Sequence, residues 1–159
     1  MVNLVVHAII SGLHDLAAVI WVGAILVNAL VLTPTFKGSP MEGMELRRKL
    51  MMQIQRRLSL LIPSSIVVVV VTGMLEARFS PAFHGLLSFA NAYSTILLVK
   101  VILTAVMIIT MIARQMIMKR IRSGKAPKEA EKLTVKLVYF NAVLGVIVIL
   151  LSGALSAVA

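Results

Sequence analysis

Four long apolar stretches constrain this chain more than any other feature. They cover roughly residues 4–33, 59–76, 93–113 and 137–158. Each approaches or exceeds the roughly 20 residues that an α-helix needs to cross about 30 Å of hydrocarbon. Because backbone polar groups in lipid must pair within their own segment, such stretches form helices. The chain is 60% hydrophobic and only 14% charged, and 159 residues cannot bury that much apolar surface in one core.

We therefore predict an all-α integral membrane protein, a four-transmembrane-helix bundle that forms a single domain over residues 1–159. The second helix is expected to begin before its apolar stretch, because Met44, Met51 and Leu58 recur at helical spacing. The helices are predicted at about residues 4–33, 43–77, 92–122 and 129–158. The first is not expected to be a cleaved signal peptide, since it lacks a basic start and runs apolar for too long.

Basic residues cluster in two of the three connections. Six of the sixteen Lys and Arg lie within residues 34–58 and eight within residues 114–136, whereas the connection near residues 76–92 carries only Glu76 and Arg78. Both basic connections follow odd-numbered helices, so the positive-inside rule places them in the cytoplasm and both termini on the extracytoplasmic side. The net charge of +10 therefore indicates orientation in a lipid bilayer rather than nucleic-acid binding. We expect a multi-pass protein of the plasma membrane.

Two of the predicted helices carry conspicuous residues at intervals of seven. They are His7, His14, Trp21 and Asn28 on the first, and Tyr93, Lys100, Met107 and Arg114 on the third. Seven residues make nearly two turns, so each set follows one helix face. The two faces are expected to line one bundle interior, and the rise per residue places His14, Asp15 and Lys100 at similar depth in its outer half.

Ionisable side chains at that depth are rare and are usually functional or paired. Lys100 and Asp15 therefore form either a structural ion pair or the charged partners of a reaction at His14. His7 is either a second ligand or an interfacial residue without a role, and His84 is either a metal ligand or a solvated loop residue.

The residue types present limit the chemistry. The chain has no cysteine, which excludes thiolate metal sites and thiol nucleophiles, and it shows no hydrolase or nucleotide-binding motif. His7 and His14 are too far apart to share one small metal ion, because ligand nitrogens lie near 2 Å from the metal. A histidine at mid-depth in a four-helix bundle is a common way to hold haem iron.

Several of these residues resemble the signature of two related membrane families. Residues 13–24, LHDLAAVIWVGA, resemble the pattern of His, six residues, Trp and small residues that opens the copper resistance D family and the HemJ-type protoporphyrinogen oxidases. Lys100 matches a lysine that both families carry in the third helix, and Asn141 is similar to an asparagine of their last helix. Pro63 and Gly73 look like part of their second helix. The resemblance implies haem b and porphyrinogen oxidation for the HemJ type, and copper uptake for the copper resistance D type.

Three functions follow from these observations. The first is a membrane redox protein that binds haem b and acts in electron transfer, with a partner that the sequence does not identify, or as a protoporphyrinogen-oxidase-like oxidoreductase. Its iron ligand is His14, with His7 as the second candidate. The residues expected around the porphyrin are Trp21, Tyr93, Lys100 and Asp15, of which the last two are the candidate catalytic residues.

The alternative is copper transport or binding, with His7, His14 and His84 as candidate ligands. The third function is a structural membrane subunit, for which small residues of the last helix are compatible with a homodimer. These small residues are Gly145, Ser152, Gly153 and Ser156.

Overall fold

The computed structural model of the chain describes residues 4–37, 44–80, 89, 91–125, 127 and 129–157. These residues are helical almost throughout, and no strand occurs among them, which confirms the all-α prediction for this part of the chain. Four helical segments are long and apolar enough to cross a membrane. They are Leu4–Thr35, Lys49–Phe79, Ala92–Ile121 and Glu129–Ala157.

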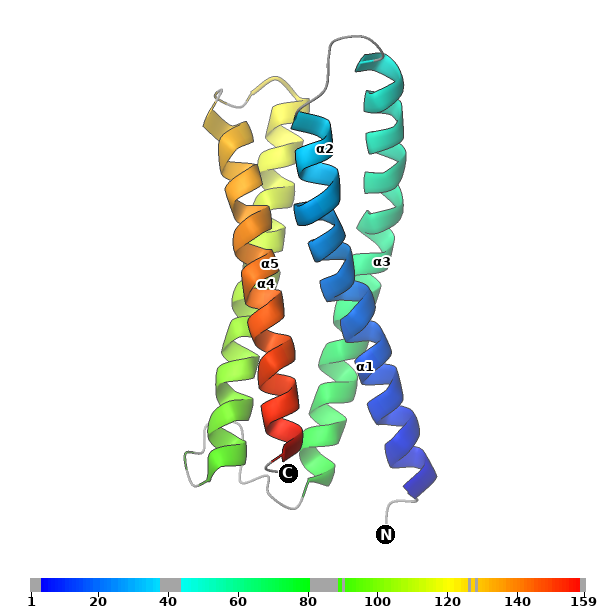
Figure 1. The fold of residues 1–159 in the computed structure, drawn as a ribbon, viewed down its shortest axis with the longest axis vertical. Helices are drawn as coiled ribbons and strands as arrows, with labels where there is room; N and C mark the ends of the chain where they lie inside the picture. Colours follow the sequence, from blue (N-terminus) through cyan, green and yellow to red (C-terminus); the bar gives the residue numbers. More distant parts are fainter. Residues whose placement is uncertain are drawn as a thin grey trace. The chain divides into compact units, whose positions relative to one another are not determined.

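The chain divides into two compact units, Met1–Phe79 and Ser80–Ala159. The long helices of the first unit are α1 (Leu4–Val27) and α3 (Met44–Phe79), and those of the second are α4 (Ala92–Arg122) and α5 (Glu129–Ala157). Within each unit the two long helices pack along one another and run in opposite directions (Figure 1). The single domain and the four-helix bundle remain predictions, because both concern the arrangement of the two units.

The first membrane helix contains a π-helical turn that the sequence pattern does not predict. This turn, η1 (Asn28–Leu32), joins α1 to the short helix α2 (Thr33–Lys37). The Thr33 backbone N–H and hydroxyl both donate to the Asn28 carbonyl, the hydroxyl at 2.7 Å. A single π turn inserts one residue into the helix, and hydrophobic periodicity carries no signal for such an insertion.

Helix α3 is longer than a membrane is thick. Its 36 residues extend over about 54 Å, compared with about 30 Å of hydrocarbon. The helix continues through Pro63 without a break. It includes Glu76, as the predicted helix at about 43–77 does, and it ends two residues later than predicted, so that Arg78 also belongs to the helix. Glu76 lies close to α1.

Local capping fixes both ends of α4. At its start the Asn91 side-chain oxygen accepts the Ser94 backbone N–H at 2.8 Å, which satisfies one of the unpaired donors of the first turn. At its end Gly124 has a φ of +69°, the left-handed conformation that terminates helices and that glycine adopts without strain. The Gly124 N–H donates to the Ile121 carbonyl at 3.1 Å.

One buried hydrogen bond joins α4 to α5. The Asn141 side-chain Nδ2 donates to the Met107 backbone carbonyl at 3.2 Å, and both residues are buried. In lipid, a side-chain amide without a partner is costly, so this contact favours one register of the two helices.

We predict that Asn141→Ala lowers the free energy of unfolding by about 1 kcal/mol, the usual range for a hydrogen bond between membrane helices. Unfolding of the purified protein by a denaturing detergent, followed by loss of helicity, measures the effect. Val143→Ala is the control, because Val143 lies on the exposed side of α5. Equal destabilisation by the two substitutions would contradict the role of the Asn141 contact.

Candidate functional site

The His14 side chain lies against α3 within the first unit. It is 7% exposed, although the neighbouring Asp15 is exposed. The facing residue of α3 is Gly73, and a Cβ atom placed on it would lie 3.1 Å from His14 Cε1 and 3.5 Å from Nδ1. The imidazole therefore occupies space that any larger residue at position 73 would take.

Two polar residues of α3 flank this glycine and contact the imidazole. His14 Nδ1 lies 3.0 Å from the Thr72 hydroxyl oxygen and 3.9 Å from the Glu76 Oε2 atom. Residues four apart share one face of a helix, so Thr72 and Glu76 both point toward α1. Thr72 is 5% exposed, whereas the Glu76 side chain is 26% exposed. The partly exposed Glu76 carboxylate therefore lies between the buried His14 ring and the end of the unit where α3 terminates.

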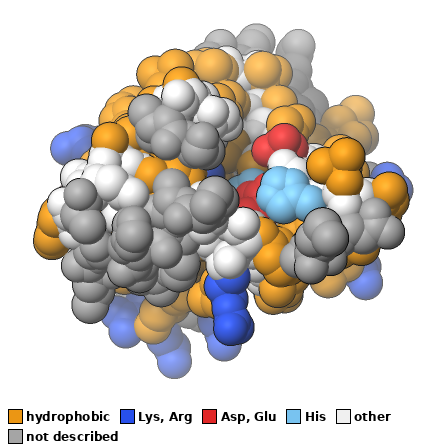
Figure 2. Space-filling view, turned by 90° about the horizontal axis from the view of Figure 1, so that it is seen from below, with side chains coloured by type: hydrophobic (Ala, Val, Ile, Leu, Met, Phe, Trp, Pro, Cys, Tyr) orange, Lys and Arg blue, Asp and Glu red, His pale blue; other side chains and the backbone are white. Residues whose placement is uncertain are grey.

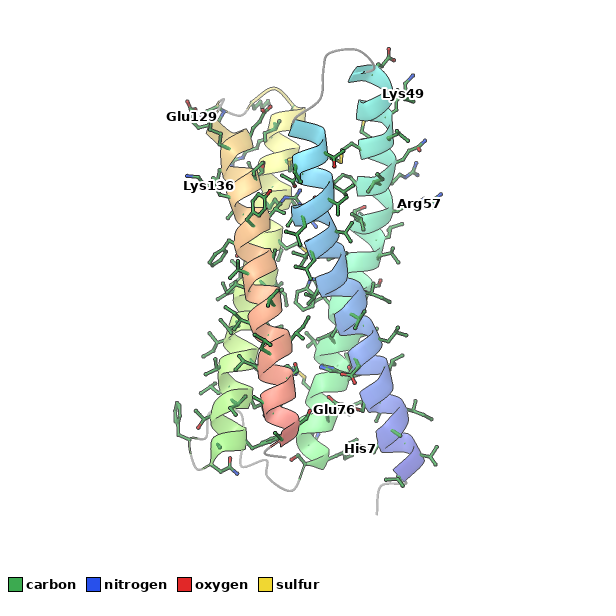
Figure 3. The ribbon with its side chains drawn as sticks, viewed as in Figure 1. His7, Lys49, Arg57, Glu76, Glu129 and Lys136 are labelled. Atoms are coloured by element: carbon green, nitrogen blue, oxygen red, sulfur yellow. The ribbon has the colours of Figure 1, made fainter. Side chains whose placement is uncertain are left out.

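The histidines of the described residues and Glu76 lie toward one end of the helix pair, whereas the other end carries the exposed basic residues Lys49, Arg56 and Arg57. Seen from the end where α1 begins and α3 terminates, the histidine and acidic side chains lie next to one another (Figure 2). His7 and Glu76 are both found there (Figure 3). His7 is exposed, and its ring centroid is 6.3 Å from that of Phe79, the last residue of α3. His7 therefore lies near the end of the helix pair where α1 begins. His14 lies about 10 Å further along the axis of α1.

This arrangement can bind a cation through few ligands. An imidazole nitrogen is a suitable ligand for copper and other transition metals, and a carboxylate supplies negative charge beside it. No group of three or more His, Cys, Asp or Glu side chains with metal-binding geometry occurs among the described residues.

The remaining predicted site residues are distributed over both units. In the first, Trp21 is 2% exposed and its indole N–H has no hydrogen-bond partner among the described residues, while Asp15 is exposed. In the second, Tyr93 is buried and Lys100 is partly buried, both on α4. The pairing of Lys100 with Asp15, and the roles of Trp21 and Tyr93 at a cofactor, remain predictions. His84 lies outside the described residues.

Sequence reasoning did not identify the α3 side of this site. Thr72, Gly73 and Glu76 follow the valine run of residues 67–71. Gly73 was noted only as part of the resemblance and Glu76 only as a charge near the following connection. A usable signal was present, because a hydroxyl and a carboxylate spaced by four with a glycine between them form one helix face. The predicted helix at about 43–77 contains this face, but the sequence does not show which helix the face contacts.

Comparison with known proteins bears on the second, third and fourth membrane helices. The family model of copper resistance protein D matches residues 52–155. The matched range includes the α3 residues of the site, as well as Lys100 and Asn141, whereas His14 and Trp21 precede it. Comparison with curated proteins gives no match, and comparison with solved structures gives none either. The match confirms the resemblance to the copper resistance D family, and the HemJ-type resemblance remains a prediction.

We predict that Gly73→Ala displaces the His14 ring, because the added methyl group would lie 3.1 Å from Cε1. Overpacking of this kind costs roughly 1–3 kcal/mol, and thermal unfolding in detergent measures it. Gly23→Ala is the matched control, since a Cβ atom there has nothing within 4 Å and an alanine favours the helix. If the two variants had the same unfolding temperature, the close approach of His14 to α3 would be wrong.

Proposed function

The chain belongs to the copper resistance protein D family, and on that premise we propose that it carries copper ions across the plasma membrane. Family membership and four apolar helices fit a multi-pass protein of that membrane. The observation that supports this function best is the pairing of the buried His14 imidazole with the Glu76 carboxylate, 3.9 Å apart. In this proposal, copper is the transported substrate and His14 is its ligand within the membrane.

The small number of metal ligands among the described residues favours transport over storage. A transported ion must be bound tightly enough to enter a site and weakly enough to leave it. His14 provides one nitrogen ligand, and the negative charge of Glu76 lowers the energy of a cation bound to the imidazole. A resident metal centre of three or four protein ligands would hold the ion too firmly for this purpose.

The distribution of charge supports a direction for this transport. Basic residues are exposed at the start of α3 and around the connection between α4 and α5, which the positive-inside rule places in the cytoplasm. These exposed residues include Lys49, Arg56, Arg57, Lys119, Arg120, Lys132 and Lys136. The termini then face outward, and His14 lies roughly 15 Å along the axis from the start of α1. With this orientation His7 is exposed at the outer end, where it would meet an ion from outside before His14 does, and we propose import as the direction.

Copper replaces haem b as the favoured ligand. The sequence favoured a haem-binding redox protein, but the family match describes copper resistance, and neither the match nor the described residues support a bound porphyrin. No contact of the described site residues favours porphyrinogen oxidation or electron transfer. The structural-subunit alternative, with a homodimer formed through α5, remains a prediction.

We predict that His14→Ala reduces copper uptake by at least about tenfold, and that Glu76→Gln reduces it by roughly tenfold. Copper content of cells that express each variant at equal membrane abundance measures the effect. Ser152→Ala is the control, because Ser152 donates only to the Val148 carbonyl of its own helix. Unchanged uptake with His14→Ala would rule out this residue as the ligand for transported copper.

The visible spectrum distinguishes copper transport from the haem alternative. We expect purified protein from cells supplied with haem to show no Soret band, because neither its family nor its described residues support a bound porphyrin. A stoichiometric Soret band that disappears in His14→Ala would instead restore the haem function and remove the copper proposal.

A further inference from the structure

The Thr72 hydroxyl has only one proton and three polar neighbours, of which the Val69 carbonyl is the most distant at 3.4 Å. Its oxygen lies 2.6 Å from the Val68 backbone carbonyl, one turn earlier on α3, and 3.0 Å from His14 Nδ1 on α1. A hydroxyl donates one hydrogen bond and accepts through its lone pairs. Which neighbour receives the proton therefore decides whether Nδ1 accepts a hydrogen bond or donates one.

The shorter contact locates the proton. A separation of 2.6 Å between two oxygens is the length of a strong O–H···O hydrogen bond, and without a proton between them the two oxygens would repel each other. Donation from a threonine hydroxyl to the carbonyl four residues earlier is also common in helices. The Thr72 proton thus points to Val68, and a lone pair of the hydroxyl oxygen faces Nδ1.

The Glu76 carboxylate acts on the same nitrogen. Its Oε2 atom lies 3.9 Å from Nδ1, and a negative charge at that distance favours an N–H there over a lone pair. Both α3 neighbours therefore require the neutral His14 ring to carry its proton on Nδ1. The lone pair of the ring, and with it the capacity to bind a metal ion, is then on Nε2.

We propose that Thr72 is a positioning residue that holds His14 in the Nδ1–H tautomer and thereby selects Nε2 as the copper ligand. Such hydrogen bonds from the second ring nitrogen orient histidine ligands and fix their tautomer in metal sites. The tautomer part of this inference is independent of copper, whereas the naming of the ligand rests on the proposed function.

Nitrogen NMR of protein labelled with ¹⁵N-histidine in detergent tests the tautomer directly. The His14 signal is assigned as the one missing in His14→Ala, and spectra are recorded at a pH where the ring is neutral. We expect wild type and Thr72→Ser to show protonated Nδ1, because serine retains the hydroxyl. We expect Thr72→Val to gain the Nε2–H form, which an isolated imidazole in water favours.

A second buried hydroxyl of α3 provides the control. Ser65 is 6% exposed and donates to the Leu61 carbonyl at 2.8 Å, with the same helical spacing as Thr72 and Val68. Ser65→Ala should leave the His14 tautomer unchanged, which separates the Thr72 contact from a general effect of removing a hydroxyl. A wild-type His14 protonated on Nε2, or a Thr72→Val spectrum equal to wild type, would overturn the inference.

Copper binding by the same variants separates this inference from the proposed function. We expect Thr72→Val to bind copper about tenfold more weakly than wild type and Thr72→Ser to restore the affinity. A tautomer that responds as expected in a protein whose copper uptake does not need His14 would leave the tautomer assignment intact and reject His14 as the ligand for transported copper. Loss of uptake in His14→Ala, with an unchanged tautomer and affinity in Thr72→Val, would reject only the role of Thr72.

Discussion

A polar side chain inside a membrane helix must find a partner, and in the first unit the His14 imidazole finds it on α3. Lipid offers no competing hydrogen bonds, so the contact between His14 and Thr72 determines how α1 and α3 face one another. Gly73 provides the space for the ring, and Glu76 places a negative charge beside it. The candidate site is therefore also part of what fixes the register of the two helices.

The sequence predicts the helices well because lipid leaves the backbone few choices. Long apolar stretches identify four membrane helices, and the residues that interrupt them, such as His14, are correctly identified as unusual. The π turn at Asn28–Leu32 could not be predicted, because it depends on an insertion that periodicity does not reveal. Glu76 falls within the predicted helix at about 43–77, but the sequence does not show that its side chain faces His14.

The partner of His14 illustrates a second limit of sequence reasoning. Intervals of seven on two helices suggested that His14 and Lys100 share one interior, which remains a prediction. The contacts of His14 with Thr72 and Glu76 lie within the first unit, and no interval in the sequence indicated them. Thr72 and Glu76 are chemically ordinary and gain their importance only from proximity to the ring. The copper resistance D match begins at residue 52 and so includes Thr72 and Glu76 but not His14. The family relation therefore supports the α3 side of the site, whereas His14 was identified from its own position in an apolar helix.

Copper movement through the purified protein tests the central claim without contributions from other cellular transporters. The protein is reconstituted into lipid vesicles, copper is added outside, and the metal content of the vesicle interior is followed over time. The account predicts that copper enters protein-containing vesicles faster than protein-free vesicles of the same composition, and that the rate saturates with copper concentration. Equal rates of entry with and without the protein would contradict it.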